Sequence, residues 1–158
     1  MSIRVKGLDK LVRDLTKFGK DAEQNVITEL EISATNIEKN AIRRAPAYLA
    51  TNTNTPLNIK QRIDKLITNR GLTVKVGVQG TQDIDAYVEF GTGLNFLEIV
   101  NARPKEYTKK IRDLAYQFYK TGDGTLKGTP YLFPSFFEET PQLIKRLKES
   151  LNELSRKA

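Results

Sequence analysis

The segment DAEQNVITELEISATNIEKNAIRRAP, residues 21–46, is the longest amphipathic stretch of the chain. Asp21 is a candidate N-cap for a helix, and Pro46 disfavours helical geometry at the residue before it. The segment therefore predicts a helix of about 24 residues, about 36 Å long. Its apolar residues recur at intervals of three and four, the spacing of one helix face: Val26, Ile27, Leu30, Ala34, Ile37, Ala41 and Ile42.

A β-hairpin is expected next along the chain. Residues 72–78 alternate apolar side chains with Thr, Lys and Gly, which is typical of a half-buried strand. Asn69-Arg70-Gly71, just before it, is a turn signal because Asn and Gly tolerate positive φ. Residues 57–69 fit either a helix or a strand, since Ile59, Ile63 and Ile67 suit both the helical and the strand period. Because a hairpin needs a second strand, we expect a strand at residues 57–68.

The remaining elements are helices and short extended segments. Residues 3–6 alternate apolar and basic side chains, which predicts an edge strand, and an apolar stripe over residues 8–18 predicts a helix ending at Gly19. A further stripe predicts a helix at about 104–120. The Pro-bracketed residues 130–134 are expected to be extended.

The last helix is indicated by Leu143, Ile144, Leu147, Leu151 and Leu154. It is expected to begin with Thr140 as N-cap and Pro141 at its first position, or earlier at Ser135. Together these elements predict one α+β domain over residues 1–158, a small antiparallel β-sheet packed against the long N-terminal α-helix, with additional central and C-terminal helices.

Composition argues against several classes of function. The chain has no cysteine and no histidine, so it lacks thiolate nucleophiles, thiolate metal ligands and the usual general base. We expect no enzyme activity, no cofactor and no metal. No apolar run approaches the roughly 18 residues of a membrane span, and the first residues do not resemble a secretory signal, so we expect a protein that stays in the cytoplasm.

The net charge of +7 is unevenly distributed. Residues 1–70 carry 13 basic and 8 acidic groups, residues 71–103 carry 2 and 4, and residues 104–158 carry 11 and 7. Such a molecule could associate with copies of itself or follow a phosphate-lined path. A solvated, mildly basic surface is the simpler interpretation, and the aromatic residues do not interleave with Arg and Lys as in a single-strand-binding surface.

Few residues suggest chemistry. Asp83, Asp85 and Glu89 are hard-oxygen ligands of the kind that Ca²⁺ and Mg²⁺ bind, but their spacing is not that of a calcium loop, and a solvated turn is favoured. The glycine pairs in Gly91-Thr92-Gly93 and Gly122-Asp123-Gly124 lack the residues of a phosphate loop or a dinucleotide fingerprint, and both predict turns.

Two segments combine aromatic residues with loop-forming ones, Tyr87 to Gly93 and Pro130 to Pro134. Their aromatic side chains belong either to the core or to a surface for a neighbouring subunit, and spacing alone slightly favours the core. If Tyr131 and Phe133 lie in an extended segment, they point in opposite directions. One would then anchor in the core and the other would contact a neighbour.

Four blocks of this sequence resemble the tail-completion, or head–tail connector, family of long-tailed bacteriophages. That family has an N-terminal Gly-Leu/Phe-x-x-Leu opening, a long helix ending in Ala-Pro, a Tyr-Val-Glu-Phe-Gly-Thr block and a Pro-Phe/Tyr-Leu-x-Pro-Ala/Ser block. The matching residues here are Gly7-Leu8-Asp9-Lys10-Leu11, Ala45-Pro46, Tyr87-Val88-Glu89-Phe90-Gly91-Thr92 and Pro130-Tyr131-Leu132-Phe133-Pro134-Ser135. Their order and spacing cover nearly the whole chain.

The resemblance implies a structural, non-enzymatic subunit of the phage neck or tail. Such a protein would complete the tail and help to join it to the head, as a homo-oligomeric ring in the virion and a monomer in solution. Its expected partners are a tail terminator and a head-side connector or stopper, with nucleic acid only as the genome passing through the ring. The candidate interface residues are Tyr87, Glu89, Phe90, Gly91, Thr92, Pro130, Tyr131, Phe133 and Pro134.

The sequence departs from the family pattern in two places. Residues 51–57, TNTNTPL, stand where the family has a Thr-Gly-x-Leu turn, and residues 94–128 resemble an insertion that carries a helix. A contractile-tail bacteriocin or a defective prophage particle would suit the chain equally well. Two other classes stay open: a basic nucleic-acid-binding accessory module, suggested by the net charge, and a small hydrolase or toxin that would use Glu89.

Overall fold

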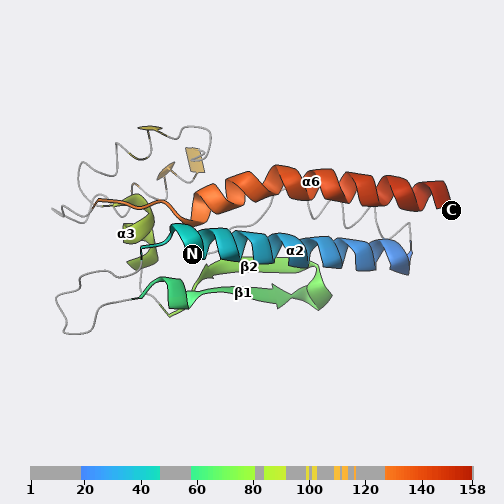
Figure 1. The fold of residues 1–158 in the computed structure, drawn as a ribbon, viewed down its shortest axis with the longest axis horizontal. Coiled ribbons are helices and arrows are strands. Elements are labelled where there is room, and N and C mark those ends of the chain that lie inside the picture. Colours follow the sequence, from blue (N-terminus) through green and yellow to red (C-terminus); the bar gives the residue numbers. More distant parts are fainter. Residues whose placement is uncertain are drawn as a thin grey trace.

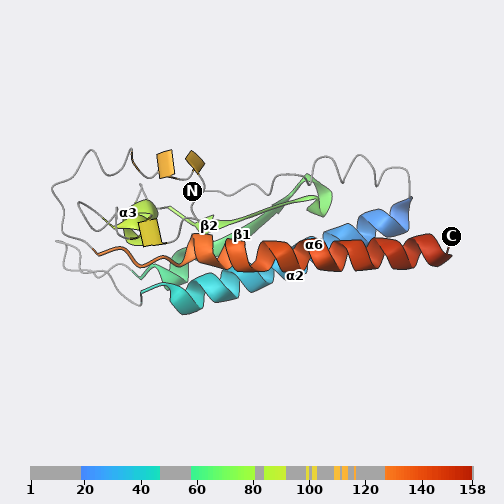
Figure 2. The same cartoon turned by 90° about the horizontal axis from the view of Figure 1, so that it is seen from above.

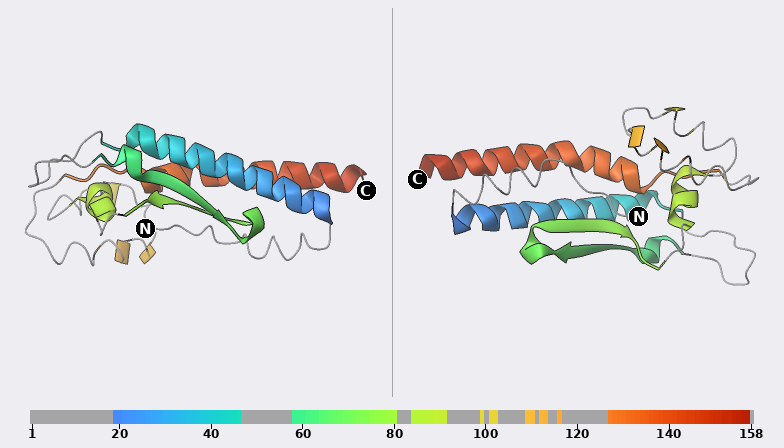
Figure 3. Two further views of the ribbon diagram at one scale, coloured as in Figure 1. Left: turned by 90° about the horizontal axis from the view of Figure 1, so that it is seen from below. Right: turned by 180° about the vertical axis from the view of Figure 1, so that it is seen from behind.

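Two long antiparallel helices and a β-hairpin form the body of the protein in a computed structural model of the chain (Figure 1). The structure describes residues 19–46, 58–80, 84–91, 99, 101–102, 109–110, 112–113, 116 and 127–157. Helix α2 (Lys20–Arg44) packs against α6 (Leu132–Lys157) on one side and against both strands on another. Views from below and from behind show the same order, with α2 between α6 and the hairpin (Figure 3). The predicted α+β fold, a small antiparallel sheet on a long helix, is confirmed.

Helix α2 has 25 residues, close to the predicted length. It ends where Ala45 takes extended geometry (φ −59°, ψ 143°) before Pro46, as expected. The predicted cap is wrong, because the N-cap is Gly19 and makes no side-chain hydrogen bond, while Asp21 lies in the first turn. The acidic side chain still suits the positive end of the helix dipole. Six apolar residues form the buried stripe, namely Ala22, Val26, Leu30, Ala34, Ile37 and Ala41.

The hairpin consists of β1 (Ile63–Thr68) and β2 (Thr73–Val78), paired antiparallel from Ile63 with Val78 to Thr68 with Thr73. The predicted first strand is shorter than expected, because a 3₁₀ turn, η1 (Lys60–Arg62), precedes it. The turn between the strands is η2 (Asn69–Gly71), where all three residues have positive φ, as the Asn-x-Gly signal predicted. A Cβ on Gly71 would lie 2.7 Å from Ile27 of α2, so glycine also permits the turn to approach the helix.

Helix α6 begins at Leu132, earlier than either predicted start. Thr140 is not its N-cap, because its hydroxyl donates to the carbonyl of Phe136 (2.7 Å) inside the helix. Pro141 therefore lies in the helix interior, on the exposed side. There, water can donate a hydrogen bond to the carbonyl of Phe137, which has no helical partner because Pro141 lacks an N–H group. The reason for the early start lies outside α6, in the short helix α3 (Ile84–Phe90).

Among the described residues, apolar packing forms two clusters along α2. The larger cluster joins the C-terminal half of α2 to the hairpin and to the first turns of α6, with Ile59, Ile63, Val76, Tyr131, Leu132 and Phe136 among its members. The smaller cluster joins Ala22, Val26 and Leu30 of α2 to Leu143 and Leu147 of α6. Since α2 contributes to both clusters, it is the element on which the hairpin and α6 are placed.

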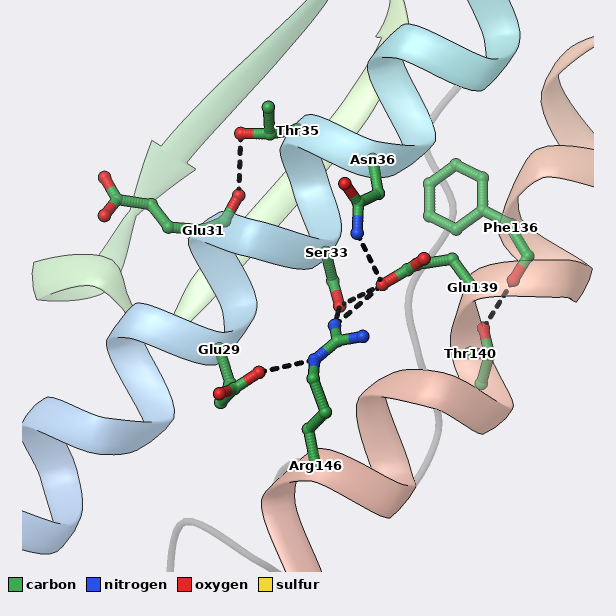
Figure 4. A network of polar contacts seen from close by, with 9 residues as sticks. All are labelled: Glu29, Glu31, Ser33, Thr35, Asn36, Phe136, Glu139, Thr140 and Arg146. Atoms are coloured by element: carbon green, nitrogen blue, oxygen red, sulfur yellow. Dashed lines mark hydrogen bonds and ion pairs between the residues drawn. The ribbon is translucent and has the colours of Figure 1, made fainter. Parts of the chain in front are cut away.

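A polar network crosses the α2–α6 interface between these clusters (Figure 4). Arg146 donates from Nε to Glu29 (2.6 Å) and from Nη2 to Ser33 Oγ (2.6 Å) and Glu139 Oε1 (2.7 Å). The same Glu139 oxygen accepts from Ser33 (2.9 Å) and from Asn36 (3.3 Å). These bonds match donors and acceptors at one relative position of the two helices, so they select the register in which α6 packs on α2.

The charge of Arg146 is balanced within this network. Burial lowers the pKa of its guanidinium, but the hydrogen bonds and charges of Glu139 and Glu29 outweigh burial and raise the pKa above its ordinary value. Arg146 is therefore charged at any ordinary pH. Sequence periodicity missed the network, although Ser33 beside Ala34 and Arg146 beside Leu147 are polar residues next to apolar stripe positions.

Several predictions fall on residues outside those described. They are the strand at 3–6, the helix at 8–18, the TNTNTPL segment and most of the 94–128 insertion. Within that insertion, Ile99, Asn101, Ala102, Lys109, Lys110, Arg112, Asp113 and Tyr116 have helical backbone geometry.

Replacing Arg146 by Met should lower the free energy of unfolding by roughly 2 to 4 kcal/mol, because Glu29 and Glu139 would be left close together without a counter-charge. Chemical denaturation measures the change. Lys145→Met is the matched control, since Lys145 is 70% exposed and reaches only Glu149 at 3.9 Å. Equal effects of the two substitutions would contradict a structural role for the network.

Candidate functional site

The two motif segments meet at the N-terminus of α6, through the carboxylate of Glu89. Glu89 lies in α3 and is 0% exposed. Its Oε2 accepts the backbone N–H groups of Tyr131 (2.8 Å) and Leu132 (2.8 Å), and its Oε1 accepts that of Phe133 (3.1 Å). We call this contact between α3 and residues 127–135 the α3–α6 junction.

The three hydrogen bonds account for the free donors of the first turn of α6. The first N–H groups of any helix lack partners within the helix. Here Tyr131, Leu132 and Phe133 donate to Glu89, and the next residue, Pro134, has no N–H to satisfy. A negative charge at this end also interacts favourably with the helix dipole. Glu89 therefore acts as a cap supplied from a distant part of the chain, which explains why the helix starts at Leu132.

Backbone contacts hold the same two segments together. The N–H of Thr129 donates to the carbonyl of Val88 (2.7 Å), and α3 ends at Gly91 with φ 76°. Gly128 lies against this end of α3, where an added Cβ would lie 2.5 Å from the Phe90 carbonyl carbon and 2.6 Å from the Gly91 nitrogen. Any side chain at Gly128 would force the segments apart, because backbone atoms cannot yield as a flexible side chain can.

The aromatic residues of both segments pack inside the protein. The rings of Phe90 and Phe133 lie 5.4 Å apart at 33°, and Tyr131 is 0% exposed within the larger apolar cluster. The expectation of an extended segment with Tyr131 and Phe133 facing opposite ways is wrong. Phe133 is in α6 and both side chains are buried, because the Glu89 cap lets the helix begin before the second proline.

The predicted interface residues therefore fall into three groups. Glu89, Phe90, Gly91, Tyr131, Phe133 and Pro134 are buried within the single chain. Tyr87 and Pro130 are half-buried, and Thr92 lies outside the described residues. The slight preference for a core role is confirmed for Phe90, Tyr131 and Phe133. The sequence predicts a solvated turn that contains Asp83, Asp85 and Glu89. For Glu89 this prediction is wrong, because Glu89 lies buried in helix α3.

The geometry of the junction is that of a structural contact. Both Glu89 oxygens accept backbone N–H groups, and the side chain has no exposed surface through which a substrate could reach it. Across the described ranges, no three His, Cys, Asp or Glu residues are grouped so that they could hold a metal ion. Local sequence patterns give no signal for the cap, because Glu89 lies 42 residues before Tyr131; only its place between the apolar residues Val88 and Phe90 indicates a buried carboxylate.

A shallow hollow on the outer face of α2 is the other site-like feature among the described residues. It is lined by Thr28, Glu31, Ile32, Thr35, Asn36 and Lys65. The Lys65 ammonium already donates to Thr35 (3.0 Å) and Glu38 (3.0 Å), which satisfies the one cation there. The hollow therefore offers a ligand no free cation among the described residues, and the exposed carboxylate of Glu31 is its remaining charged group.

Comparisons with models of known protein families, with curated proteins and with solved structures found no match to this chain. Of the helices in the described part of the chain, none is long and apolar enough to cross a membrane.

Replacing Glu89 by Gln should lower the free energy of unfolding by roughly 2 to 4 kcal/mol, because an amide group would face N–H donors and the charge at the helix end would be lost. Glu149→Gln serves as the control, since that carboxylate is 60% exposed and pairs only weakly with Lys145. Urea denaturation of both variants measures the difference. Wild-type stability of the Glu89→Gln protein would show that the cap contributes little.

Proposed function

We propose that this chain is a structural subunit of the neck or tail of a long-tailed bacteriophage, or of a related tail-like particle, where it completes the tail and helps to join it to the head. The observation that carries the proposal is the α3–α6 junction. Tyr87–Thr92 and Pro130–Ser135 carry most of the sequence resemblance to the tail-completion family, and Glu89 of the first segment caps the helix that begins in the second. The two motifs that resemble the family together form one structural contact, the capped start of α6. This supports a fold shared with that family.

The shape of the described body suits a building block. Helices of 25 and 26 residues, each about 38 Å long, lie side by side with a network of charged groups between them. Figure 2 shows this elongated body from above. Because Arg146 pairs with Glu29 and Glu139 across the two helices, the pair of helices resists a change in relative position when neighbouring subunits exert force on it.

Contacts with neighbouring subunits would use surfaces other than the buried junction. Phe137 and Ile144 are 44% and 45% exposed and lie seven residues apart on one face of α6. Leu66 on the outer face of the hairpin is 57% exposed. Exposed apolar residues on separate elements support head-to-side association into a ring, with the tail terminator and the head-side connector or stopper as its partners.

A basic nucleic-acid-binding accessory module is the second candidate. A specific observation favours it, because residues 39–62 contain five basic residues and no acidic one. The two candidates differ in where the protein is found. A neck subunit remains in finished particles, whereas an accessory module is absent from them.

Deleting the gene for this chain from its phage or prophage should yield filled heads and separate tails, because the joining subunit would be missing. Electron microscopy of lysates counts joined and separate particles, and expression of the chain from a plasmid should restore joining. Mass spectrometry of purified particles should detect the protein. Normal particles from the deletion strain, together with absence of the chain from wild-type particles, would refute the proposal.

A further inference from the structure

One face of α2 is turned away from both of its large neighbours. Helix α6 lies along one side of α2 and the hairpin along another, and a third face lies between them (Figure 1). Its residues are spaced by four, three, four, four, three and four positions, which keeps them on one stripe of the helix. They are Asp21, Asn25, Thr28, Ile32, Asn36, Lys39 and Arg43. We call these seven residues the outer stripe.

The outer stripe is accessible along its whole length. Asn25 and Asn36 are half-buried and the other five residues are exposed, with Ile32 41% exposed at the centre. Among the described residues, no carboxylate lies within ion-pair distance of Lys39 or Arg43, and no basic group lies within that distance of Asp21. These groups are therefore available to another molecule.

The shallow hollow described above lies at the centre of the outer stripe. Four of the residues that line it are Thr28, Glu31, Ile32 and Thr35, at positions i, i+3, i+4 and i+7 of the helix. Four residues of one helix form the hole that receives a side chain of the facing helix in a coiled coil. The two threonine hydroxyls donate to carbonyls one turn earlier in α2 (3.0 and 2.9 Å), so their methyl groups can contact an apolar side chain. The hollow therefore fits a helix that presents an apolar residue.

The outer stripe is complementary to itself when a second copy is turned end for end. Its spacing is the same when read from either end, with Ile32 in the middle. In an antiparallel pair, Ile32 faces Ile32 of the second copy, and residues equally far from Ile32 on opposite sides share a layer. Asp21 then meets Arg43, and Asn25 meets Lys39. Each of these layers pairs an acceptor with a donor, because a carboxylate faces a guanidinium and an amide oxygen faces an ammonium group.

The helix dipole explains the charges at the two ends of the stripe. An acidic residue near the N-terminus and a basic residue near the C-terminus are favourable in any helix. The dipole explains neither the exposed isoleucine midway nor the equal spacing on its two sides. A parallel pair would place Asp21 beside Asp21 and Arg43 beside Arg43, and like charges repel. Of the two orders, only the antiparallel one brings opposite charges together.

We propose that two copies of this chain associate through their outer stripes as an antiparallel dimer, in which Ile32 of each copy enters the hollow of the other. The contact would extend over about 33 Å of each helix. Because both copies use the same surface, it closes after two subunits and is separate from the head-to-side contacts of the proposed ring. The family resemblance implied a monomer in solution, whereas this contact predicts a dimer. One apolar layer among polar ones makes the dimer weak.

Sedimentation of the full chain tests the proposal over roughly 1 μM to 1 mM, the range in which weak contacts form. Ile32→Glu places two carboxylates at the centre of the contact and should raise the dissociation constant roughly tenfold or more. Ile144→Glu is the matched control, since Ile144 is 45% exposed and lies on α6. It should change the constant by less than about twofold. Circular dichroism should show that both variants fold, since both side chains are exposed.

Disulfide formation tests the orientation of the two copies, because the chain has no cysteine of its own. Under mild oxidation, Ile32→Cys should form a covalent dimer, whereas Ile144→Cys should not. An equimolar mixture of Asn25→Cys and Lys39→Cys should give mainly the mixed dimer, because these two positions come close enough for a disulfide only in the antiparallel order.

A chain that stays monomeric over this range would overturn the proposal, as would a dimer that Ile32→Glu weakens no more than Ile144→Glu does. Mixed cross-links in no more than the random proportion would overturn the antiparallel order. These outcomes are independent of the proposed function. A chain that is found in particles but stays monomeric refutes only the dimer, whereas a chain that dimerises through α2 but is absent from particles refutes only the neck assignment.

Discussion

The structure depends on the three hydrogen bonds by which Glu89 caps α6. A buried carboxylate is costly unless donors meet its charge, and buried N–H groups at a helix start are costly unless an acceptor meets them. Each group satisfies the other here. The cap fixes the first residue of α6. The apolar contacts of Leu143 and Leu147 and the hydrogen bonds of Arg146 then decide which face of that helix meets α2.

Because this junction is buried, most of its residues stabilise the fold and do not face solvent. The motif residues pack inside the chain, where Phe90 lies against Phe133 and Tyr131 is buried in the larger apolar cluster. Exposed apolar side chains lie elsewhere, for example Phe137 and Ile144 on one face of α6.

Local sequence patterns correctly predicted the elements whose structure depends on residues close in sequence. The stripe of α2 and the Asn69-Arg70-Gly71 turn gave a helix and a hairpin close to those observed. The start of α6 was predicted wrongly because its cap comes from a residue 42 positions before Tyr131. Pro130 and Pro134 predict an extended segment when only neighbouring residues are considered, and this prediction does not include a capping carboxylate from elsewhere in the chain. The network around Arg146 was missed for the same reason, since its partners lie on another helix.

Amide hydrogen exchange followed by NMR tests the central claim, that Glu89 caps α6, most directly. The account predicts that the amides of Tyr131, Leu132 and Phe133 exchange as slowly as those in the middle of α6, because all three donate to a buried carboxylate. The first amides of α2, Lys20 and Asp21, follow an N-cap without a side-chain bond and should exchange rapidly. Exchange of the three α6 amides as rapid as that of Lys20 and Asp21 would contradict the account.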